Sequence, residues 1–98
     1  DEAYTLIEKA MKLSPNDPFI TDSFGWVLFR QGKIDEAEQQ LRQAFQLRAD
    51  PEIAVHLGEV LWVKGDKEGA MDFFRQAKAK DAKNELLHST LSRLKIGL

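Results

Sequence analysis

Apolar residues recur every three or four positions along most of the chain, and this spacing is typical of helices. The first segment, residues 3–13, carries its apolar positions at Ala3, Leu6, Ile7, Ala10, Met11 and Leu13. The same period predicts further helices at about 18–31, 34–48, 51–64, 67–80 and 85–96. No segment alternates with a period of two, so we expect no strands. The pattern predicts an all-helical chain whose helices form antiparallel pairs joined by short turns.

Prolines, glycines and short polar stretches separate these segments. Pro15 interrupts the first helical pattern, because proline lacks a backbone donor and disfavours a helical conformation in the residue before it. Gly32 is expected to end the second helix, and Gly65 the fourth, as C-terminal caps. Asp35 is expected to be the N-cap of the third helix. These signals place the turns between the helices.

Four small or apolar positions recur at a fixed distance along the chain. Each member of one set is followed 33 positions later by its counterpart in the other: Gly25, Ala37, Leu41 and Ala44 recur as Gly58, Ala70, Phe74 and Ala77. Repeats of this length are helical hairpins, and stacked neighbours bury one another's apolar faces. We therefore expect one repeat domain over residues 1–98, with repeats at 18–50 and 51–84. Residues 1–17 then end a preceding repeat, and residues 85–98 form a terminal helix.

Gly25 and Gly58 lie inside predicted helices, where a glycine costs about 1 kcal/mol relative to alanine. A glycine at such a position needs a packing reason. We expect each to lie where two helices cross closely, with Ala37 opposite Gly25 and Ala70 opposite Gly58.

The spacing of these residues resembles that of the tetratricopeptide repeat family, over essentially the whole chain. Phe24-Gly25 and Leu57-Gly58 are similar to the Leu-Gly pair of that family's first helix, and Pro15 to its closing proline. The resemblance implies an all-α fold of antiparallel helix-turn-helix repeats stacked as a short right-handed solenoid. The chain departs from the family at its early tryptophan position, which carries Thr21, Ala54 and His88, and at its closing proline, which Ala49 and Ala82 replace.

Composition and charge narrow the classes of partner. The 98 residues are 43% hydrophobic and 31% charged, an ordinary globular balance, and the chain is too short for a large enclosed active-site cavity. A net charge of -2 without a basic stripe disfavours nucleic acid. The absence of cysteine excludes disulfides and thiolate metal sites. No apolar run approaches the roughly 20 residues of a membrane span.

The resemblance also implies where a partner binds, because first helices line the concave face in this family. Carried over by position, the groove comprises Phe19, Asp22, Trp26, Phe29, Arg30, Val55, Glu59, Trp62 and Arg93. Tryptophan and arginine are enriched in binding hot spots. A mixed apolar and weakly acidic groove suits a protein or peptide segment with apolar anchors and some basic residues.

A second interpretation of the groove aromatics is that they only seal the contact between neighbouring hairpins. Ordinary core spacing favours this interpretation for Phe29 and Trp62 and leaves Trp26 open. Trp26 stands where the family more often has a polar residue. One branch of the family binds C-terminal carboxylates through a cationic clamp, but the matching positions here are Asp22, Trp26, His56, Glu52 and Thr90. Binding of chaperone tails is therefore disfavoured.

Catalysis finds little support in the sequence. His56 and Glu59 share one helical face and could form a proton-transfer pair or contribute metal ligands. No nucleophile or third ligand lies nearby, so an ordinary surface or groove histidine is the favoured interpretation. We expect no enzyme activity, no metal and no cofactor.

These observations predict a non-enzymatic scaffold or adaptor that binds a protein partner in its concave groove. The alternative is a structural segment of a longer repeat protein, with self-association through its exposed ends. The chain opens as helix without a cap, so we expect a fragment of a longer protein. Residues 22–30 and 56–62 are similar to C-terminal repeats of bacterial proteins of this family, including outer-membrane lipoproteins. The predicted location is the periplasmic face of that membrane, with the cytoplasm as the alternative.

Overall fold

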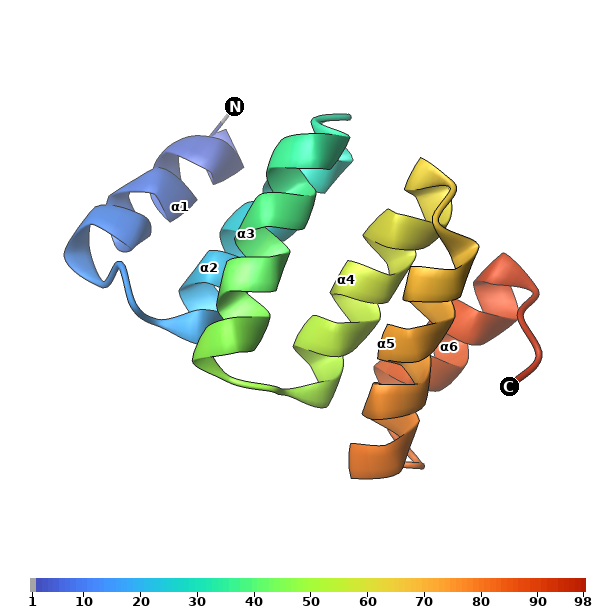
Figure 1. The fold of residues 1–98 in the computed structure, drawn as a ribbon. Coiled ribbons are helices and arrows are strands. Elements are labelled where there is room, and N and C mark those ends of the chain that lie inside the picture. The colour runs from blue at the N-terminus through green and yellow to red at the C-terminus, as the bar shows by residue number, and fades with distance from the viewer. Residues whose placement is uncertain (1) are drawn as a thin grey trace. The chain divides into compact units, whose positions relative to one another are not determined.

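Six α-helices follow one another in the computed structural model, which describes residues 2–98 apart from the side chain of Ala3. Their bounds are α1 Glu2–Leu13, α2 Pro18–Arg30, α3 Ile34–Leu47, α4 Pro51–Lys64, α5 Lys67–Lys80 and α6 Glu85–Leu94 (Figure 1). No strand occurs within residues 2–98, so the predicted all-α class is confirmed. The predicted apolar role of Ala3 lies outside the described side chains. None of the described helices has the length and apolar character needed to cross a membrane.

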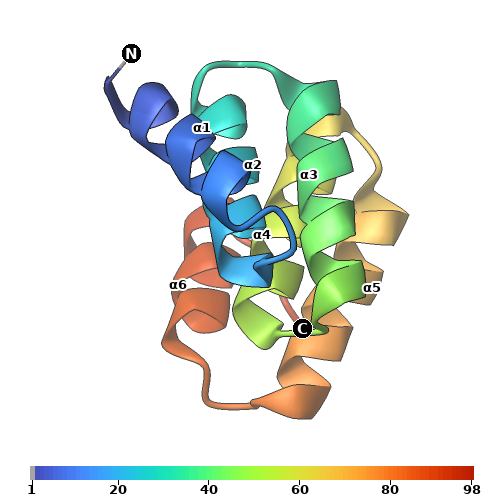
Figure 2. The ribbon, with the colours of Figure 1, turned by 90° about the vertical axis from the view of Figure 1, so that its left-hand side faces the viewer.

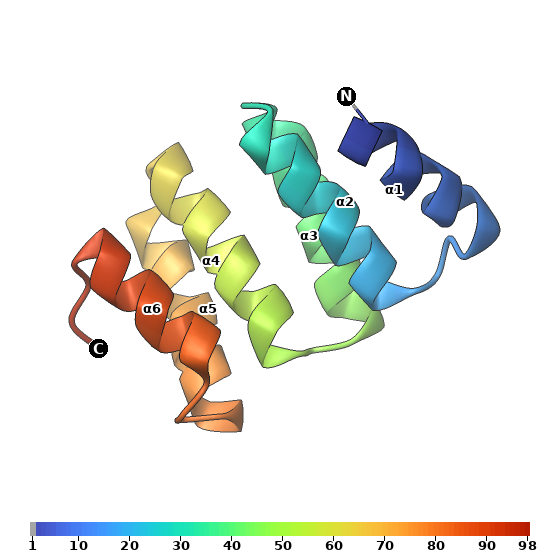
Figure 3. The same cartoon turned by 180° about the vertical axis from the view of Figure 1, so that it is seen from behind.

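The chain divides into two compact units, Asp1–Ala49 and Asp50–Leu98. In the first unit α2 packs against both α1 and α3, and Figure 2 shows α1 crossing in front of α2. In the second unit α4 packs against α5 and α6, which Figure 3 shows from behind. Each unit therefore contains one helical hairpin and one additional helix. The repeat boundaries expected from the sequence stay a prediction.

Short polar side chains cap the starts of four helices. The carboxylate of Asp17 accepts hydrogen bonds from the backbone N–H groups of Phe19 and Ile20, at 2.9 and 3.2 Å, at the start of α2. Single bonds of 2.9 Å serve the other three helices, from Glu52 N to Asp50, from Gly69 N to Asp66 and from Leu87 N to Asn84. Each such cap stabilises its helix by about 1 kcal/mol.

Two helix ends differ from the sequence prediction. The N-cap of α3 is Lys33, which makes no side-chain capping bond, so the expected N-cap role of Asp35 is wrong. Asp35 lies in the first turn of α3, where a carboxylate interacts favourably with the positive end of the helix dipole. The last helix ends at Leu94 instead of Ile96, because Lys95 adopts a left-handed conformation with φ 60°.

Helices α2, α4 and α6 end in the same backbone motif. A residue with positive φ terminates each helix: Gly32 at 81°, Gly65 at 106° and Lys95 at 60°. The residue that follows then donates its N–H to a carbonyl five positions back, from Lys33 to Leu28, Asp66 to Leu61 and Ile96 to Leu91, each at 2.9 Å. This is the Schellman arrangement, which glycine adopts without the steric cost of a Cβ atom.

Each of the two hairpins contains a close crossing between its own two helices. A Cβ atom added at Gly25 would lie 2.8 Å from Cγ of Leu41, and one at Gly58 would lie 2.6 Å from Cε1 of Phe74. Leu41 and Phe74 therefore supply the atoms nearest the glycines, in place of the expected Ala37 and Ala70. The reason is that the larger side chains reach across the crossing and fill the space which the missing Cβ leaves. All four repeat alanines, Ala37, Ala44, Ala70 and Ala77, are fully buried.

In the first unit, α1 packs against α2 through aromatic and polar contacts. The rings of Tyr4 and Phe24 lie with centroids 5.6 Å apart. Thr21, at the family's tryptophan position, is fully buried; its hydroxyl donates to the carbonyl of Asp17 at 2.9 Å and lies 3.7 Å from the sulfur of Met11. A polar residue is accommodated there because the backbone one turn earlier accepts its hydrogen bond.

Candidate functional site

Aromatic side chains gather on one face of α2. Phe19, Trp26, Phe29 and Arg30 follow one another at helical spacing and form what we call the α2 surface. The rings of Trp26 and Phe29 lie 4.9 Å apart between centroids, with their planes at 35°. Both rings are half-buried, and Phe19 is 46% exposed. The α2 surface therefore presents apolar area that the hairpin core does not cover.

Positive charge accompanies the α2 surface. The guanidinium of Arg48, just after α3, lies 5.5 Å from the ring centroid of Phe19. A cation over an exposed ring contributes about 0.5–1 kcal/mol, enough to orient the ring. Arg30 is exposed at the last turn of α2, whereas Asp22 on the same helix is buried. The charges exposed on this face are thus basic.

A bidentate ion pair joins α4 to α6 in the second unit. The two terminal nitrogens of Arg93 lie 2.6 and 3.0 Å from the two carboxylate oxygens of Glu59. The Glu59 side chain is 7% exposed and that of Arg93 is 57% exposed. The hydrogen bond to Glu59 raises the pKa of Arg93, with desolvation opposing it and the charge of Glu59 adding to it. This Glu59–Arg93 pair fixes α6 on α4.

The pairing changes the interpretation of Glu59. Because both of its carboxylate oxygens accept hydrogen bonds from Arg93, Glu59 contributes to the packing of α6 on α4. His56 is half-buried on α4. Among residues 2–98, no group of three or more His, Cys, Asp or Glu side chains is placed to hold a metal ion.

The remaining groove residues of the second unit take part in packing. Val55 is fully buried, and the Trp62 ring is half-buried with the ammonium of Lys67 4.3 Å from its centroid. The predicted groove residues thus fall into two sets within separate units, and the joint groove stays a prediction. Those that present exposed or half-exposed side chains are Phe19, Trp26, Phe29, Arg30, Trp62 and Arg93, and those that are buried are Asp22, Val55 and Glu59.

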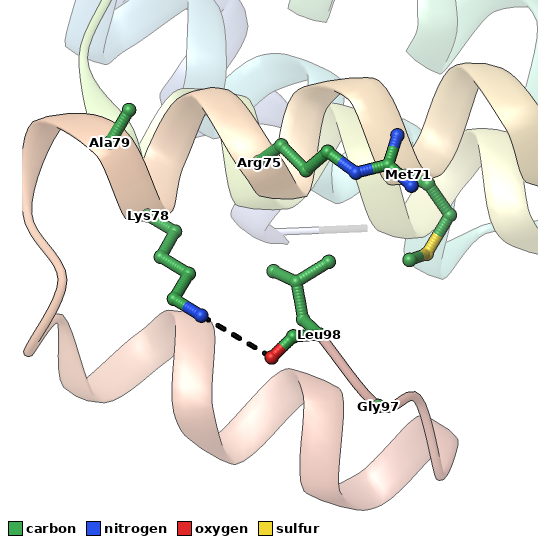
Figure 4. Close-up of a pocket in the computed structure, with 6 residues that line it drawn as sticks. All are labelled: Met71, Arg75, Lys78, Ala79, Gly97 and Leu98. Atoms are coloured by element: carbon green, nitrogen blue, oxygen red, sulfur yellow. Dashed lines mark hydrogen bonds between the residues drawn. The ribbon is translucent and has the colours of Figure 1, made fainter.

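A pocket of ≈ 540 Å³ lies in the second unit, between α5 and the last residues of the chain (Figure 4). It is lined by Met71, Arg75, Lys78, Ala79, Gly97 and Leu98. This pocket is not among the sites predicted from the sequence. One signal is visible in the sequence, because the four residues from α5 are spaced as one helical face. The sequence gives no such signal for the part of the pocket formed by residues 97 and 98, because that part depends on the path of the chain after α6.

The Glu59–Arg93 ion pair is a second feature that is not predicted from the sequence, although both residues are among the predicted groove residues. Its signal is the spacing, since the opposite charges lie 34 residues apart, close to one repeat length, on successive first helices. Corresponding positions on neighbouring repeats are close in space in stacked helical hairpins.

Comparison with known proteins agrees with this geometry. A family model described as tetratricopeptide repeat matches residues 23–85. The TPR repeat-containing protein PA4667 of Pseudomonas aeruginosa is 59% identical over 58 residues, which cover 59% of this chain and 10% of that protein. The human protein O-mannosyl-transferase TMTC1 is 31% identical over a stretch that covers 96% of this chain and 11% of that protein.

A solved structure is also similar over nearly the whole chain. The crystal structure of TTC0263, a thermophilic TPR protein of Thermus thermophilus, matches with a TM-score of 0.84 and 26% identity, covering 97% of this chain and 50% of that one. The chain spans about a tenth of the length of the curated relatives it matches.

Proposed function

Because the chain belongs to the tetratricopeptide repeat family, we propose that it is a non-enzymatic module that binds a peptide segment of a protein partner through the α2 surface. The fold generally mediates protein–protein interaction and is generally not catalytic. The proposal adds a specific surface to that general role. The wider concave groove predicted from the sequence includes this surface.

The observation that carries the proposal is the half-exposed Trp26–Phe29 pair. The buried residues of α2 are Thr21, Asp22, Gly25 and Leu28, so the two rings are not part of the buried hairpin core. Paired aromatic rings are rigid, and covering a further 100 Å² of their apolar area would stabilise a complex by roughly 2–3 kcal/mol. Such a pair has the chemistry of a binding hot spot.

The charges around the α2 surface refine the expected partner. Asp22 and Glu59 are the predicted groove acids from which basic residues in the partner are expected. Both residues are buried, whereas Arg48 lies over the ring of Phe19 and Arg30 is exposed at the end of α2. We therefore propose an apolar anchor flanked by acidic residues.

Selection from a random peptide library displayed on phage tests the proposal without a known partner. Peptides selected on the native chain should bind the Trp26→Ala/Phe29→Ala variant at least about tenfold more weakly in fluorescence anisotropy. Phe45→Ala, which truncates another half-buried aromatic of the same unit, is the matched control and should bind like the native chain. Circular dichroism checks that each variant keeps its helicity. Equal affinity of the double variant would contradict the proposal.

A structural role through self-association is the second candidate. Leu6 and Leu13 of α1 are 61% and 84% exposed, and exposed leucines favour association. Sedimentation equilibrium should then show a mass that rises with concentration, and Leu6→Glu/Leu13→Glu should abolish the rise. A monomer at all concentrations would exclude this candidate. The periplasmic location, with the cytoplasm as the alternative, stays a prediction that fractionation of cells making the parent protein would test.

A further inference from the structure

The pocket of the second unit combines an apolar wall with two cations. Met71 and Ala79 belong to α5 and Leu98 lies across from this helix, while Lys78 extends from α5 toward Leu98 and Arg75 runs along α5 toward Met71 (Figure 4). Its volume of ≈ 540 Å³ falls within the range of about 300–1,000 Å³ that is usual for ligand pockets. The pocket lies wholly within one unit and does not include the α2 surface.

Contacts made by the chain itself indicate which chemistry the pocket accepts. The ammonium of Lys78 donates a hydrogen bond of 3.3 Å to the carbonyl oxygen of Leu98. The side chain of Leu98 points toward α5 and lies between the side chains of Lys78 and Met71 (Figure 4). Leu98 remains 40% exposed, so it forms one wall of the pocket and leaves space beside it. An aliphatic group near Met71 and an oxygen acceptor near Lys78 are thus compatible with this site.

The charges around the pocket favour an anionic ligand. Residues 75–83 contain four bases and one acid, with Arg75 and Lys78 in the pocket wall and Lys80, Asp81 and Lys83 further along. The contact of Arg75 with Asp72 is 3.6 Å long, and both side chains are more than half exposed. Such an exposed pair contributes little, so Arg75 can exchange Asp72 for a ligand carboxylate at small cost.

We propose that this pocket is a second binding site, for an acidic peptide segment that carries an aliphatic side chain. The aliphatic side chain contacts Met71 and Leu98, and neighbouring carboxylates bind Arg75 and Lys78. Apolar contact gives the site its selectivity for leucine-like residues, and the two cations give it selectivity for acidic flanks.

Fluorescence anisotropy with a labelled Glu-Asp-Leu-Leu-Asp-Glu peptide tests the proposal on the full chain. Arg75→Glu/Lys78→Glu should weaken binding at least about tenfold, because it replaces attraction by repulsion. Lys9→Glu/Lys12→Glu makes the same change of charge on α1 and should leave the affinity within about twofold. Arg75→Gln/Lys78→Gln provides a milder variant with the same direction of effect if charge reversal disturbs folding.

Two further comparisons distinguish binding in this pocket from general charge attraction and from binding to the α2 surface. A Glu-Asp-Ser-Ser-Asp-Glu peptide should bind at least about fivefold more weakly, because it lacks the aliphatic groups. Because the α2 surface is itself proposed to bind an apolar anchor flanked by acidic residues, the leucine peptide is also measured on the Trp26→Ala/Phe29→Ala variant, where the binding that remains is due to the pocket. Adding Arg75→Glu/Lys78→Glu to that variant should still weaken this binding at least about tenfold, so failure of the α2 proposal leaves this one intact. The proposal is overturned by any of three results: no saturable binding by the native chain, equal loss in both charge-reversed variants, or equal affinity for the serine peptide.

Discussion

The hairpins α2–α3 and α4–α5 carry the same repeated positions, yet different side chains fill their helix crossings and their first helices are buried to different extents. Gly25 faces the branched aliphatic side chain of Leu41, whereas Gly58 faces the ring of Phe74. The first helices differ further, since four residues of α2 are buried and eight of α4, including Val55, Glu59 and Val60. The greater burial means that α4 has fewer side chains available for a partner.

The counterpart of Trp26, 33 positions later, shows this difference in burial at a single position. It is Glu59, which is buried and paired with Arg93, while Trp26 is half-exposed on the α2 surface. A position that faces solvent in one repeat thus serves helix packing in the next. The exposure of a side chain therefore cannot be carried from repeat to repeat by register alone, although the buried glycine and alanine positions can.

The largest expected effects come from emptying the crossings. Phe74→Ala should lower the free energy of unfolding by about 3–5 kcal/mol, because it removes a fully buried ring and leaves a cavity. Leu41→Ala should cost less, about 2–4 kcal/mol, since it removes a smaller side chain. Urea denaturation measures both. Equal losses would show that the two crossings are energetically alike despite their different side chains.

Adding a methyl group at the glycines tests the same crossings from the other direction. Gly58→Ala should destabilise the chain by about 1–3 kcal/mol, because the new Cβ would overlap a buried ring. Gly25→Ala should cost less, since Leu41 has rotamers through which it can move away. Combining Gly58→Ala with Phe74→Leu should recover part of the loss in thermal unfolding. A double variant no more stable than the sum of the single changes would place the strain elsewhere.

The ion pairs of the two units should differ by a smaller amount. Arg93→Met should destabilise by about 1–2 kcal/mol, because it leaves the buried Glu59 carboxylate without its bidentate partner. Arg42→Met removes the Glu38–Arg42 contact of 2.7 Å within α3, and such a pair is worth about 0.3–0.5 kcal/mol. Chemical denaturation ranks the two variants. Faster amide exchange of α6 in Arg93→Met would show that the pair fixes this helix, and unchanged exchange would contradict that role.

A small stabilising effect is expected at the end of α6. Lys95→Gly should stabilise the chain by about 0.5–1 kcal/mol, because Lys95 has a left-handed φ of 60° that disfavours a side chain. Gly65→Lys, at the C-cap of α4 with φ 106°, should have the opposite sign. Differential scanning calorimetry measures both. Destabilisation by Lys95→Gly would mean that the lysine charge at the helix end outweighs its backbone strain.

Much of the fold is predictable from the sequence because it depends on local periodicity. The helical period and the punctuation by Pro15, Gly32 and Gly65 place all six helices to within about two residues, which is the usual uncertainty of helix ends. The repeated glycines indicate the close crossings as well. The partner of each glycine is not predictable in the same way, since it depends on how far Leu41 and Phe74 extend between the helices.

The candidate sites are less predictable because they depend on tertiary contacts. Residue type and helical spacing suggest Trp26 and Phe29, and these rings do lie together. The burial of Glu59 follows from its pairing with Arg93 on another helix, which local patterns do not reveal. Asp35 satisfies the composition of an N-cap, but α3 already begins at Ile34, so Lys33 is the N-cap and Asp35 lies in the first turn. The pocket beside α5 likewise requires the return of residues 97 and 98.

Titration of ¹⁵N-labelled chain with a peptide selected on the native protein tests the central claim most directly. We expect the indole N–H of Trp26 and the amides of Phe29 and Arg30 to shift progressively to saturation, because the peptide covers the α2 surface. The affinity from these shifts should match that from anisotropy. Saturable binding that leaves the α2 resonances unchanged and shifts only other surfaces would contradict the account.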